Sequence, residues 1–492
     1  MAENSTLRSE LWIGGTWRPA TEGGYDVEEP ATGTVMGQAG SASAEDVDAA
    51  VRAAHEAFID RRWSGLSGRE RSRILLKIAE LIRENTEALA QAESRDVGKP
   101  ITFARVVDVP GAADQFEYFA ALAQQMDGSV RDTPLPAFAY TRREPHGVVA
   151  AISPFNFPLI LSASKLAPAL AAGNTVVHKP APQTPASAQL LGEIFQQAGL
   201  PDGVYNLVTG PGAETGRQLV THTQVSAVAF TGSTVVGREV ARTAGELLKP
   251  VAAELGGNAA NLVFADADLE TAVETIISAF VFNTGQFCMA GSRLLVQRPV
   301  YEQVLEILGA AVGGVPLGDP SDEGTVIGPL VSGAQRERVE RMVDDAVSAG
   351  ARVITGGSRI EKDGGYYYAP TVLADLPEDA EAVREEIFGP VLTVQPFDTE
   401  AEAVALANST PYGLAAGLQT SDLSRAHRVS EQLRAGIVWV NTWATLDVAV
   451  PFGGVGASGW GRESGPEALA SFTRTKSVIM AISPEASTPG AS

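Results

Sequence analysis

The sequence has a single cysteine, Cys288, among its 492 residues. One thiol excludes an intrachain disulfide and a cluster of thiolate metal ligands, so nothing in the chain indicates an oxidising compartment. The five histidines lie far apart and show none of the spacings that are typical of metal sites. We therefore expect no metal site, and any thiol chemistry must be carried out by Cys288 alone.

Positive charge is scarce as well, because 37 lysines and arginines stand against 59 aspartates and glutamates, a net charge of −22. A negative field of this size repels nucleic acids and anionic membranes, so we expect neither as a partner. No apolar run approaches the roughly 18 residues that cross a membrane. Residues 1–10 lack the basic and apolar segments of a signal peptide. These absences predict a cytoplasmic location.

Apolar residues are plentiful, at 45% of the chain, and the length exceeds that of one ordinary core. Two or three folded domains are therefore expected, and a disordered chain is excluded. Helical and strand-like segments alternate, which predicts an α/β fold with mainly parallel strands. Near the N-terminus, one amphipathic helix is expected from Asp46 and another after the capping box of Ser67 and Glu70. The strands predicted beyond them are residues 148–152, 175–178, 205–209, 227–230 and 250–253.

Polar residues follow several of these strands directly. In a doubly wound parallel sheet, ligands bind beyond the carboxyl ends of the strands, so such residues are candidates for a site. They are Asn156, Lys179, Ser233 and Glu254. After Glu254 the alternation restarts with a helix at 268–280 and a strand at 294–297, which predicts a second α/β domain around Cys288.

Cys288 lies among small and polar residues, which indicates an accessible thiol, although an isolated free cysteine is more often buried and inert. Six further motifs accompany it in order: Ser153–Pro158, Lys165–Asn174, Phe230–Thr234, Glu254–Gly257, Glu386–Pro390 and Pro451–Gly454. Together these segments resemble the NAD(P)-dependent aldehyde dehydrogenase family from about residue 12 to residue 476. Any one of these strings could arise by chance, but six in register make coincidence negligible.

The resemblance implies two doubly wound Rossmann-type domains plus a small β oligomerisation element. The NAD(P)-binding domain would comprise residues 1–124 and 146–254, and the catalytic domain residues 255–456. The oligomerisation element would comprise residues 125–145 and 470–482, followed by a flexible tail at 483–492. A homodimer or homotetramer is expected.

The resemblance also implies oxidation of an aldehyde to its carboxylic acid with reduction of NAD(P). Cys288 would add to the aldehyde, giving a hemithioacetal whose oxyanion expels hydride and leaves a thioester. The Asn156 amide and the Cys288 backbone N–H would stabilise the oxyanion. Glu254 would activate the water that hydrolyses the thioester. Lys165 would assist this proton transfer, or else be a charge on a helix surface.

Phosphate binding is expected where the strand ending near Phe230 enters a helix through a turn of small residues, although no G-x-G-x-x-G pattern is present. The resemblance assigns Lys179 to the adenosine ribose, and Glu386 and Phe388 to the nicotinamide ribose and ring. The full set of cofactor-binding candidates is Ser153, Pro154, Phe155, Lys179, Pro182, Gly232, Ser233, Gly237, Leu255, Glu386 and Phe388.

Pro182 departs from the family pattern, because relatives that strictly prefer NAD often carry a glutamate three residues after the lysine. Proline provides neither a hydrogen-bond acceptor for the ribose hydroxyls nor a charge that repels a 2′-phosphate, whereas Lys179 could pair with that phosphate. We expect NAD as cofactor, with substantial acceptance of NADP.

Bulky apolar residues surround the predicted nucleophile. Phe155 stands where a tryptophan is common, and the pocket candidates are Phe157, Phe287, Met289 and Trp443. Aromatic side chains stack against flat substrates, and no Arg or Lys is evident among these positions. The sequence therefore favours aromatic or hydrophobic aldehydes over aldehydes that carry a carboxylate.

Three alternatives remain open. A dehydrogenase that passes the acyl group to coenzyme A typically lacks the hydrolytic glutamate, so Glu254 argues against it. A cysteine hydrolase would need a histidine near the nucleophile, and none lies near these motifs. A catalytically silent relative is disfavoured by the presence of Cys288, Asn156 and Glu254 together.

Overall fold

The structure, a computed structural model, describes residues 7–482. Within that range the helices are α1 (Ala44–Ile59), α2 (Gly68–Glu84), α3 (Thr86–Val97), α4 (Ile101–Phe103), α5 (Val109–Leu122), α6 (Pro158–Ala171), α7 (Ala186–Gln197), α8 (Gly212–Thr221), α9 (Thr234–Glu246), α10 (Leu269–Val281), α11 (Tyr301–Val312), α12 (Gly333–Ser348), α13 (Glu381–Arg384), α14 (Glu400–Ala407), α15 (Leu423–Gln432) and α16 (Ala468–Ser471). Both helices predicted near the N-terminus are confirmed, and Ser67 and Glu70 form the expected capping box at the start of α2. No helix in the described range is long and apolar enough to cross a membrane.

The first sheet has the order β19-β11-β10-β7-β8-β9-β1-β2. Its strands are β1 (Glu10–Ile13), β2 (Thr16–Pro19), β7 (Val148–Ile152), β8 (Thr175–Lys179), β9 (Tyr205–Leu207), β10 (Val225–Thr231), β11 (Val251–Glu254) and β19 (Gly459–Trp460). The strands from β9 to β11 are parallel, and the chain winds outward from β7 to either side. The carboxyl ends of β7 and β10 therefore flank the point where the winding reverses, which is where ligands bind in such folds.

Apolar residues on both faces of the first sheet explain its burial between helices. Val149 and Ala151 of β7 pack into the core that contains α2, α5, α6 and α7. Val148 and Ala150 pack into the opposite core, with α1 and α8. Continuous apolar strands are typical of parallel sheets that are covered on both sides.

The second sheet has the order β14-β15-β16-β13-β12-β17-β18. Its strands are β12 (Ala260–Val263), β13 (Arg293–Gln297), β14 (Arg352–Thr355), β15 (Thr371–Ala374), β16 (Val391–Phe397), β17 (Ala415–Gln419) and β18 (Ile437–Val440). Its strands are parallel apart from β14. The predicted α/β fold with mainly parallel strands is confirmed in both sheets. The exact domain boundaries stay a prediction.

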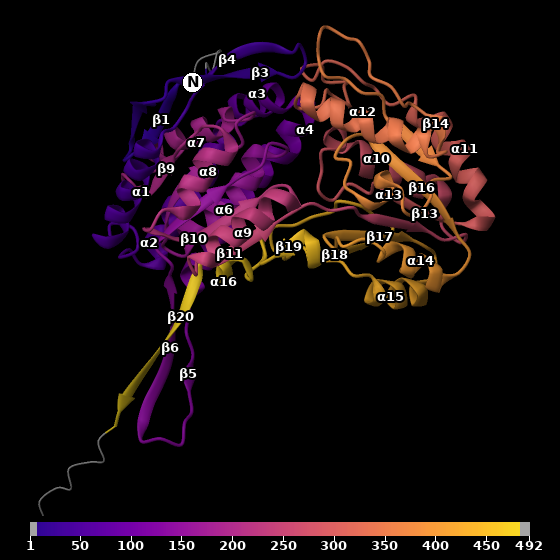
Figure 1. The fold of residues 1–492 in the computed structure, drawn as a ribbon. Helices are drawn as coiled ribbons and strands as arrows, with labels where there is room; N and C mark the ends of the chain where they lie inside the picture. The colour runs from indigo at the N-terminus through magenta and orange to yellow at the C-terminus, as the bar shows by residue number, and fades with distance from the viewer. Residues whose placement is uncertain (1–6, 483–492) are drawn as a thin grey trace, which may run out of the picture.

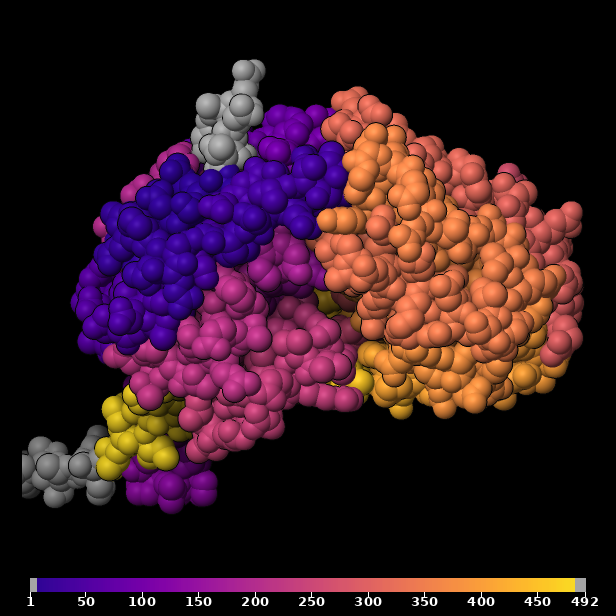
Figure 2. All heavy atoms as spheres, turned by 45° about the horizontal axis from the view of Figure 1, so that its top comes forward, coloured from indigo at the N-terminus to yellow at the C-terminus, as the bar shows by residue number. Residues whose placement is uncertain are grey.

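The two sheets form two lobes, with the N-terminal segments in one and the orange segments in the other (Figure 1). The space-filling view is hollowed where the magenta and orange segments meet (Figure 2). Asn156 and Glu254 follow strands of the first sheet, whereas Cys288 precedes β13 of the second. The candidate residues therefore come from the carboxyl ends of one sheet and the amino ends of the other.

Two further strand groups complete the described fold. The strands β3 (Gly24–Glu29) and β4 (Thr34–Gly40) pair with each other. The strands β5 (Val130–Arg131), β6 (Ala137–Pro145) and β20 (Thr473–Ala481) form a separate sheet that extends away from both lobes (Figure 1). This sheet lies where the oligomerisation element was expected. The predicted flexible tail, residues 483–492, lies outside the described residues.

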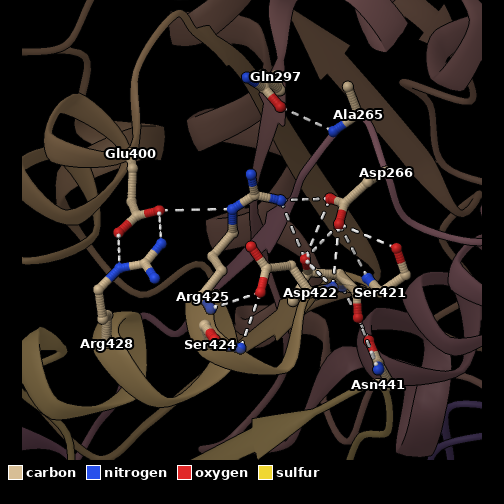
Figure 3. A network of polar contacts seen from close by, with 11 residues as sticks. Ala265, Asp266, Gln297, Glu400, Ser421, Asp422, Ser424, Arg425, Arg428 and Asn441 are labelled. Atoms are coloured by element: carbon tan, nitrogen blue, oxygen red, sulfur yellow. Dashed lines mark hydrogen bonds and ion pairs between the residues drawn. The ribbon is translucent and has the colours of Figure 1, made fainter.

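A polar network occupies the carboxyl ends of the central strands of the second sheet (Figure 3). Asp266, shortly after β12, accepts hydrogen bonds from the hydroxyl of Thr420 and from the backbone N–H groups of Ser421 and Asp422. Arg425 of α15 forms an ion pair with the same carboxylate. Burial opposes ionisation of Asp266, but these hydrogen bonds and the Arg425 charge outweigh it and lower the pKa of the carboxyl. The network ties the ends of β12 and β17 together.

We predict that Asp266→Asn lowers the free energy of unfolding by about 1–3 kcal/mol at pH 7, because it weakens several charge-assisted hydrogen bonds at once. Because the folded-state pKa is lowered, this stabilisation exists above the unfolded pKa and shrinks as the pH falls below about 4. Denaturant unfolding of the wild-type chain and of the variant, at pH 7 and below about pH 4, measures the difference in unfolding free energy. Asp398→Asn is the control, since Asp398 forms an exposed ion pair with Arg298 that should contribute much less to stability. Equal losses in the two variants would contradict the prediction.

Candidate active site

The loop that carries Cys288 has a strained backbone. Asn283, Thr284 and Gly285 all have positive φ angles, of 49°, 57° and 70°. A side chain at Gly285 would clash with the backbone of Gly389, so this position requires glycine. Left-handed conformations at two non-glycine residues cost energy that the surrounding contacts must offset, and such strain is concentrated at functional sites.

Asn156 provides one of those contacts. Its side-chain Nδ2 donates to the Gln286 carbonyl at 3.0 Å, and its own carbonyl accepts a hydrogen bond from Asn283 Nδ2 at 2.8 Å. The turn after β7 is thereby fastened to the loop before Cys288. Asn156, which is 3% exposed, is thus held against the residue two positions before Cys288.

Cys288 is half-buried among the apolar side chains of this loop. Burial raises the pKa of the thiol, and the negative charges of Glu386, Glu254 and Glu463 raise it further. The thiol is therefore protonated at neutral pH. To act as a nucleophile it has to pass its proton to a nearby base.

Glu254 at the end of β11 is a suitable base. Its side chain is buried, and neither carboxyl oxygen has a hydrogen-bond partner in the described part of the chain. Burial raises its pKa well above the usual value, and the charge of Glu463 adds to this effect, whereas Lys165 and Arg462 oppose it. A carboxyl group with a raised pKa can take and return a proton near neutral pH.

The glycines after Glu254 allow the chain that enters the second sheet to pack closely against the loops before β13 and β16. A side chain at Gly257 would clash with the Cys288 carbonyl, and one at Gly256 would clash with the carboxylate of Glu386. The backbone N–H of Gly257 also donates to Glu386 at 3.1 Å. This close approach places Glu254, Cys288 and Glu386 around one small region.

Behind Glu254 lies a buried ion pair between Lys165 and Glu463. The Lys165 ammonium also donates to the Thr231 hydroxyl, and Ser164 donates to Glu463. Lys165 is fully buried, so the alternative that it is a helix-surface charge is wrong. Sequence reasoning missed Glu463, because only the backbone pairing of Phe452 with Glu463 brings it next to a recognisable motif.

The candidate phosphate-binding turn has the predicted form. Ser233 caps α9 by accepting a hydrogen bond from Val236 N–H at 3.3 Å. A side chain at Gly237 would clash with Leu255, and one at Gly232 would clash with the Phe230 ring. The two glycines let the start of α9 pack closely against β10 and Leu255, and the first turn of the helix has backbone N–H groups that would suit a pyrophosphate.

Lys179 at the end of β8 has spare donor capacity. Its buried ammonium donates to the Pro180 carbonyl at 3.0 Å, its one hydrogen bond to the described residues. Burial lowers its pKa to about 8. A buried ammonium with unfilled donors fits a polar ligand such as a ribose or phosphate. Pro182 is half-buried in the turn that follows.

The remaining cofactor candidates divide into two groups. Ser153 is buried, and its hydroxyl is hydrogen-bonded to His178 at 2.9 Å in the interior of the first lobe. Pro154 is the next residue in the chain. Phe155 meets Phe388 edge to face with the ring centroids 5.6 Å apart, joining the two lobes. Burial raises the pKa of Glu386, beside Phe388, to about 8.

The four pocket candidates lie in one apolar cluster against which Cys288 packs. Each is less than a tenth exposed, and the cluster includes Phe282, which sequence reasoning missed. Phe157 and Phe287 meet edge to face at 5.5 Å, and Phe157 stacks on Phe282 at 5.8 Å. The Trp443 indole N–H donates to the Met289 carbonyl at 2.9 Å, which fixes the tryptophan behind the nucleophile loop.

The arrangement agrees with the comparisons with known proteins. The model of the aldehyde dehydrogenase family matches residues 17–478. A putative aldehyde dehydrogenase from Burkholderia cenocepacia is 42% identical, with a TM-score of 0.95 over 98% of this chain and 99% of that chain. The P. syringae AldA indole-3-acetaldehyde dehydrogenase, a cysteine-to-alanine mutant in complex with NAD+ and IAA, is 39% identical, with a TM-score of 0.95 over 97% of each chain. An NAD+ complex of an aldehyde dehydrogenase from Bacillus cereus is 41% identical, with a TM-score of 0.95 over 96% of each chain. A match over nearly the whole length, at this identity and with this superposition, shows that the chain belongs to the aldehyde dehydrogenase family.

Proposed function

We propose that this chain oxidises an aromatic aldehyde to its carboxylic acid, with NAD as the hydride acceptor. The observation that carries the proposal is the convergence of a thiol, a primary amide and an unpartnered buried carboxyl group from two different sheets. Cys288, Asn156 and Glu254 supply these groups.

The first half of the reaction uses all three groups. Glu254 takes the thiol proton as the Cys288 sulfur adds to the carbonyl carbon. The Asn156 amide and the Cys288 backbone N–H donate to the oxyanion that forms. The oxyanion then re-forms the carbonyl, the carbon releases hydride, and a thioester to Cys288 remains. Bound NAD supplies the acceptor for that hydride.

The second half hydrolyses the thioester. Glu254 first releases the thiol proton to solvent. It then removes a proton from a water molecule whose oxygen adds to the thioester carbon, and the Cys288 thiolate leaves as the acid forms and takes this proton back. The Lys165–Glu463 pair lies beside Glu254 and controls its proton affinity through charge. A dehydrogenase that transfers the acyl group to coenzyme A would not need this carboxyl group.

Several residues are suited to hold the dinucleotide. The first turn of α9 offers N–H groups for the pyrophosphate, and Lys179 offers free donors for the adenosine ribose. Glu386 is placed by the Gly257 N–H to accept from the nicotinamide ribose. The relatives from P. syringae and B. cereus that bind NAD+ support this assignment.

The preference for aromatic aldehydes is supported by the Phe157, Phe282 and Phe287 rings beside Cys288. The cation nearest these rings, Lys99, is paired with Asp108 and Glu93 and is not free to bind a substrate carboxylate. The relative that is an indole-3-acetaldehyde dehydrogenase points the same way.

We also propose a homodimer or homotetramer assembled through the sheet of β5, β6 and β20. Phe138, Ile479 and Met480 on this sheet are exposed apolar side chains that a partner subunit would cover. Lys476 pairs with Glu144 at 3.3 Å, whereas Arg142, opposite Lys476, has no ion pair among the described residues, so an acidic surface of a second copy would suit this face. Sedimentation equilibrium measures the number of subunits.

We predict that the protein reduces NAD with benzaldehyde, releases benzoic acid and needs no coenzyme A. Cys288→Ala should lower the rate by at least about a thousandfold, because the covalent route is lost. Absorbance of the reduced nicotinamide measures the rate. Activity with aliphatic aldehydes alone would contradict the aromatic preference. A requirement for coenzyme A would favour acyl transfer, and inactivity with every aldehyde would favour a silent relative.

We predict that NADP is turned over at no less than about a thousandth of the NAD rate, and that Pro182→Glu lowers kcat/KM for NADP by at least about tenfold. The new carboxylate would repel the 2′-phosphate and accept from the ribose hydroxyls of NAD. Pro182→Gln is the matched control, because it removes the proline without adding charge and should leave NADP use intact. A similar loss of kcat/KM for NADP in both variants would show that the shape of the turn, and not the added charge, sets the cofactor preference.

We predict opposite shifts in the acid limb of the pH–kcat profile for two variants of the ion pair. Glu463→Gln removes a charge that raises the pKa of Glu254, so the limb moves to lower pH. Lys165→Met removes a charge that lowers this pKa, so the limb moves to higher pH. Glu467→Gln is the control, because Glu467 lies four residues after Glu463 with an exposed side chain, and it should leave the acid limb in place. Shifts in the same direction would contradict the charge explanation.

A further inference from the structure

Lys99, between α3 and α4, is a buried charge outside the groups used so far. It is 1% exposed, although lysine is among the residues that are least often buried. Its ammonium lies 2.8 Å from Asp108 and 3.7 Å from Glu93, both fully buried. Removing three ionisable groups from water is costly, and an apolar cluster of similar volume is often at least as stable. The cluster therefore calls for a reason other than stability.

The two acids come from elements that lead to the active site. Asp108 ends a short π-helix, Ala104–Asp108, between α4 and α5, a type of distortion that is frequent at functional sites. Glu93 accepts a hydrogen bond from the backbone N–H of Leu159 at 3.0 Å. Leu159 lies in the first turn of α6, directly after the turn that carries Asn156 and Phe157. No side chain within that turn caps α6, so Glu93 satisfies a helix N–H from a distant part of the chain.

The ammonium also contacts an aromatic ring. Lys99 Nζ lies 4.1 Å from the centroid of the Phe157 ring. Phe157 is in edge-to-face contact with Phe287, the residue before Cys288. A cation is attracted to the face of an aromatic ring, and this attraction is stronger when water is excluded. The Asp108 and Glu93 carboxylates hold the ammonium, so the ammonium fixes the plane of the ring.

We propose that Lys99 is a positioning residue that orients the Phe157 ring and thereby shapes the aromatic wall of the substrate pocket beside Cys288. This inference rests on the proposed oxidation of aromatic aldehydes. Lys99 acts through geometry and not through its field, because the charges that act on the thiol belong to Glu386, Glu254 and Glu463.

The test compares KM and kcat for benzaldehyde and acetaldehyde in Lys99→Met and in the wild-type chain with NAD. We expect KM for benzaldehyde to rise at least about tenfold, because a pocket wall discriminates flat substrates by about that factor or more. The kcat for acetaldehyde should change by less than about threefold, since a small aldehyde does not need the wall. Lys249→Met is the matched control. Lys249 donates to the carbonyls of Val220 and His222, at the opposite end of β11 from Glu254, and its replacement should leave the preference between the two aldehydes unchanged.

Phe157→Leu separates positioning from folding, because it removes the ring and leaves both ion pairs in place. It should show the same loss of preference for benzaldehyde, and adding Lys99→Met to it should change that preference no further. Asp108→Asn keeps an oxygen near the ammonium and should therefore lose less of the preference for benzaldehyde. If Lys99→Met does not fold, the preference measured in Asp108→Asn tests the inference instead.

An unchanged preference in Lys99→Met, equal losses of kcat for both aldehydes, or additive effects in the double variant would overturn the inference. A wild-type chain that oxidises neither aldehyde would instead overturn the proposed function.

Discussion

The candidate site depends on a single constraint, the close approach of backbone segments without side chains around the loop that carries Cys288. Gly257 lies against the Cys288 carbonyl, and Gly285 lies against the backbone of Gly389. With Cβ atoms at these positions the Cys288 loop would have to shift away from its neighbours in the second sheet. The Asn156 amide and the Glu254 carboxyl group come from the carboxyl ends of one sheet, whereas the thiol comes from the amino ends of the other. The hydrogen bonds of Asn156 with Gln286 and Asn283 join these two ends.

The electrostatics of the site follow from the same approach. Bringing the sheets together removes Cys288 and Glu254 from water and gathers three acidic side chains near one thiol, so both groups favour their neutral forms. The Lys165–Glu463 pair places an opposing charge beside Glu254 without neutralising it fully. The raised pKa of Glu254 favours proton exchange near neutral pH, whereas the Cys288 thiol keeps its proton until a base accepts it.

The two sheets have similar topologies but use opposite ends. In the first sheet, the turn into α9 and the ammonium of Lys179 lie at the carboxyl ends of the strands, where we propose that the dinucleotide binds. In the second sheet the corresponding ends are occupied by the network around Asp266 and Arg425 (Figure 3). The second sheet instead places Cys288, the proposed nucleophile, at its amino ends.

The amino-acid sequence by itself determined the α/β class, the five strands β7 to β11 of the first sheet, the capping box of α2 and the candidate thiol, amide and carboxyl residues. These follow from local patterns, because periodicity, caps and short motifs involve residues that are neighbours in the chain. It did not determine the burial of Lys165, the part played by Glu463 or the contact of Lys99 with Phe157. Lys165 and Glu463 lie 298 positions apart, and their contact exists only because the chain returns through β19 to the first sheet. The pKa shifts likewise arise from burial and from charges brought together by folding, so only the tertiary structure decided them.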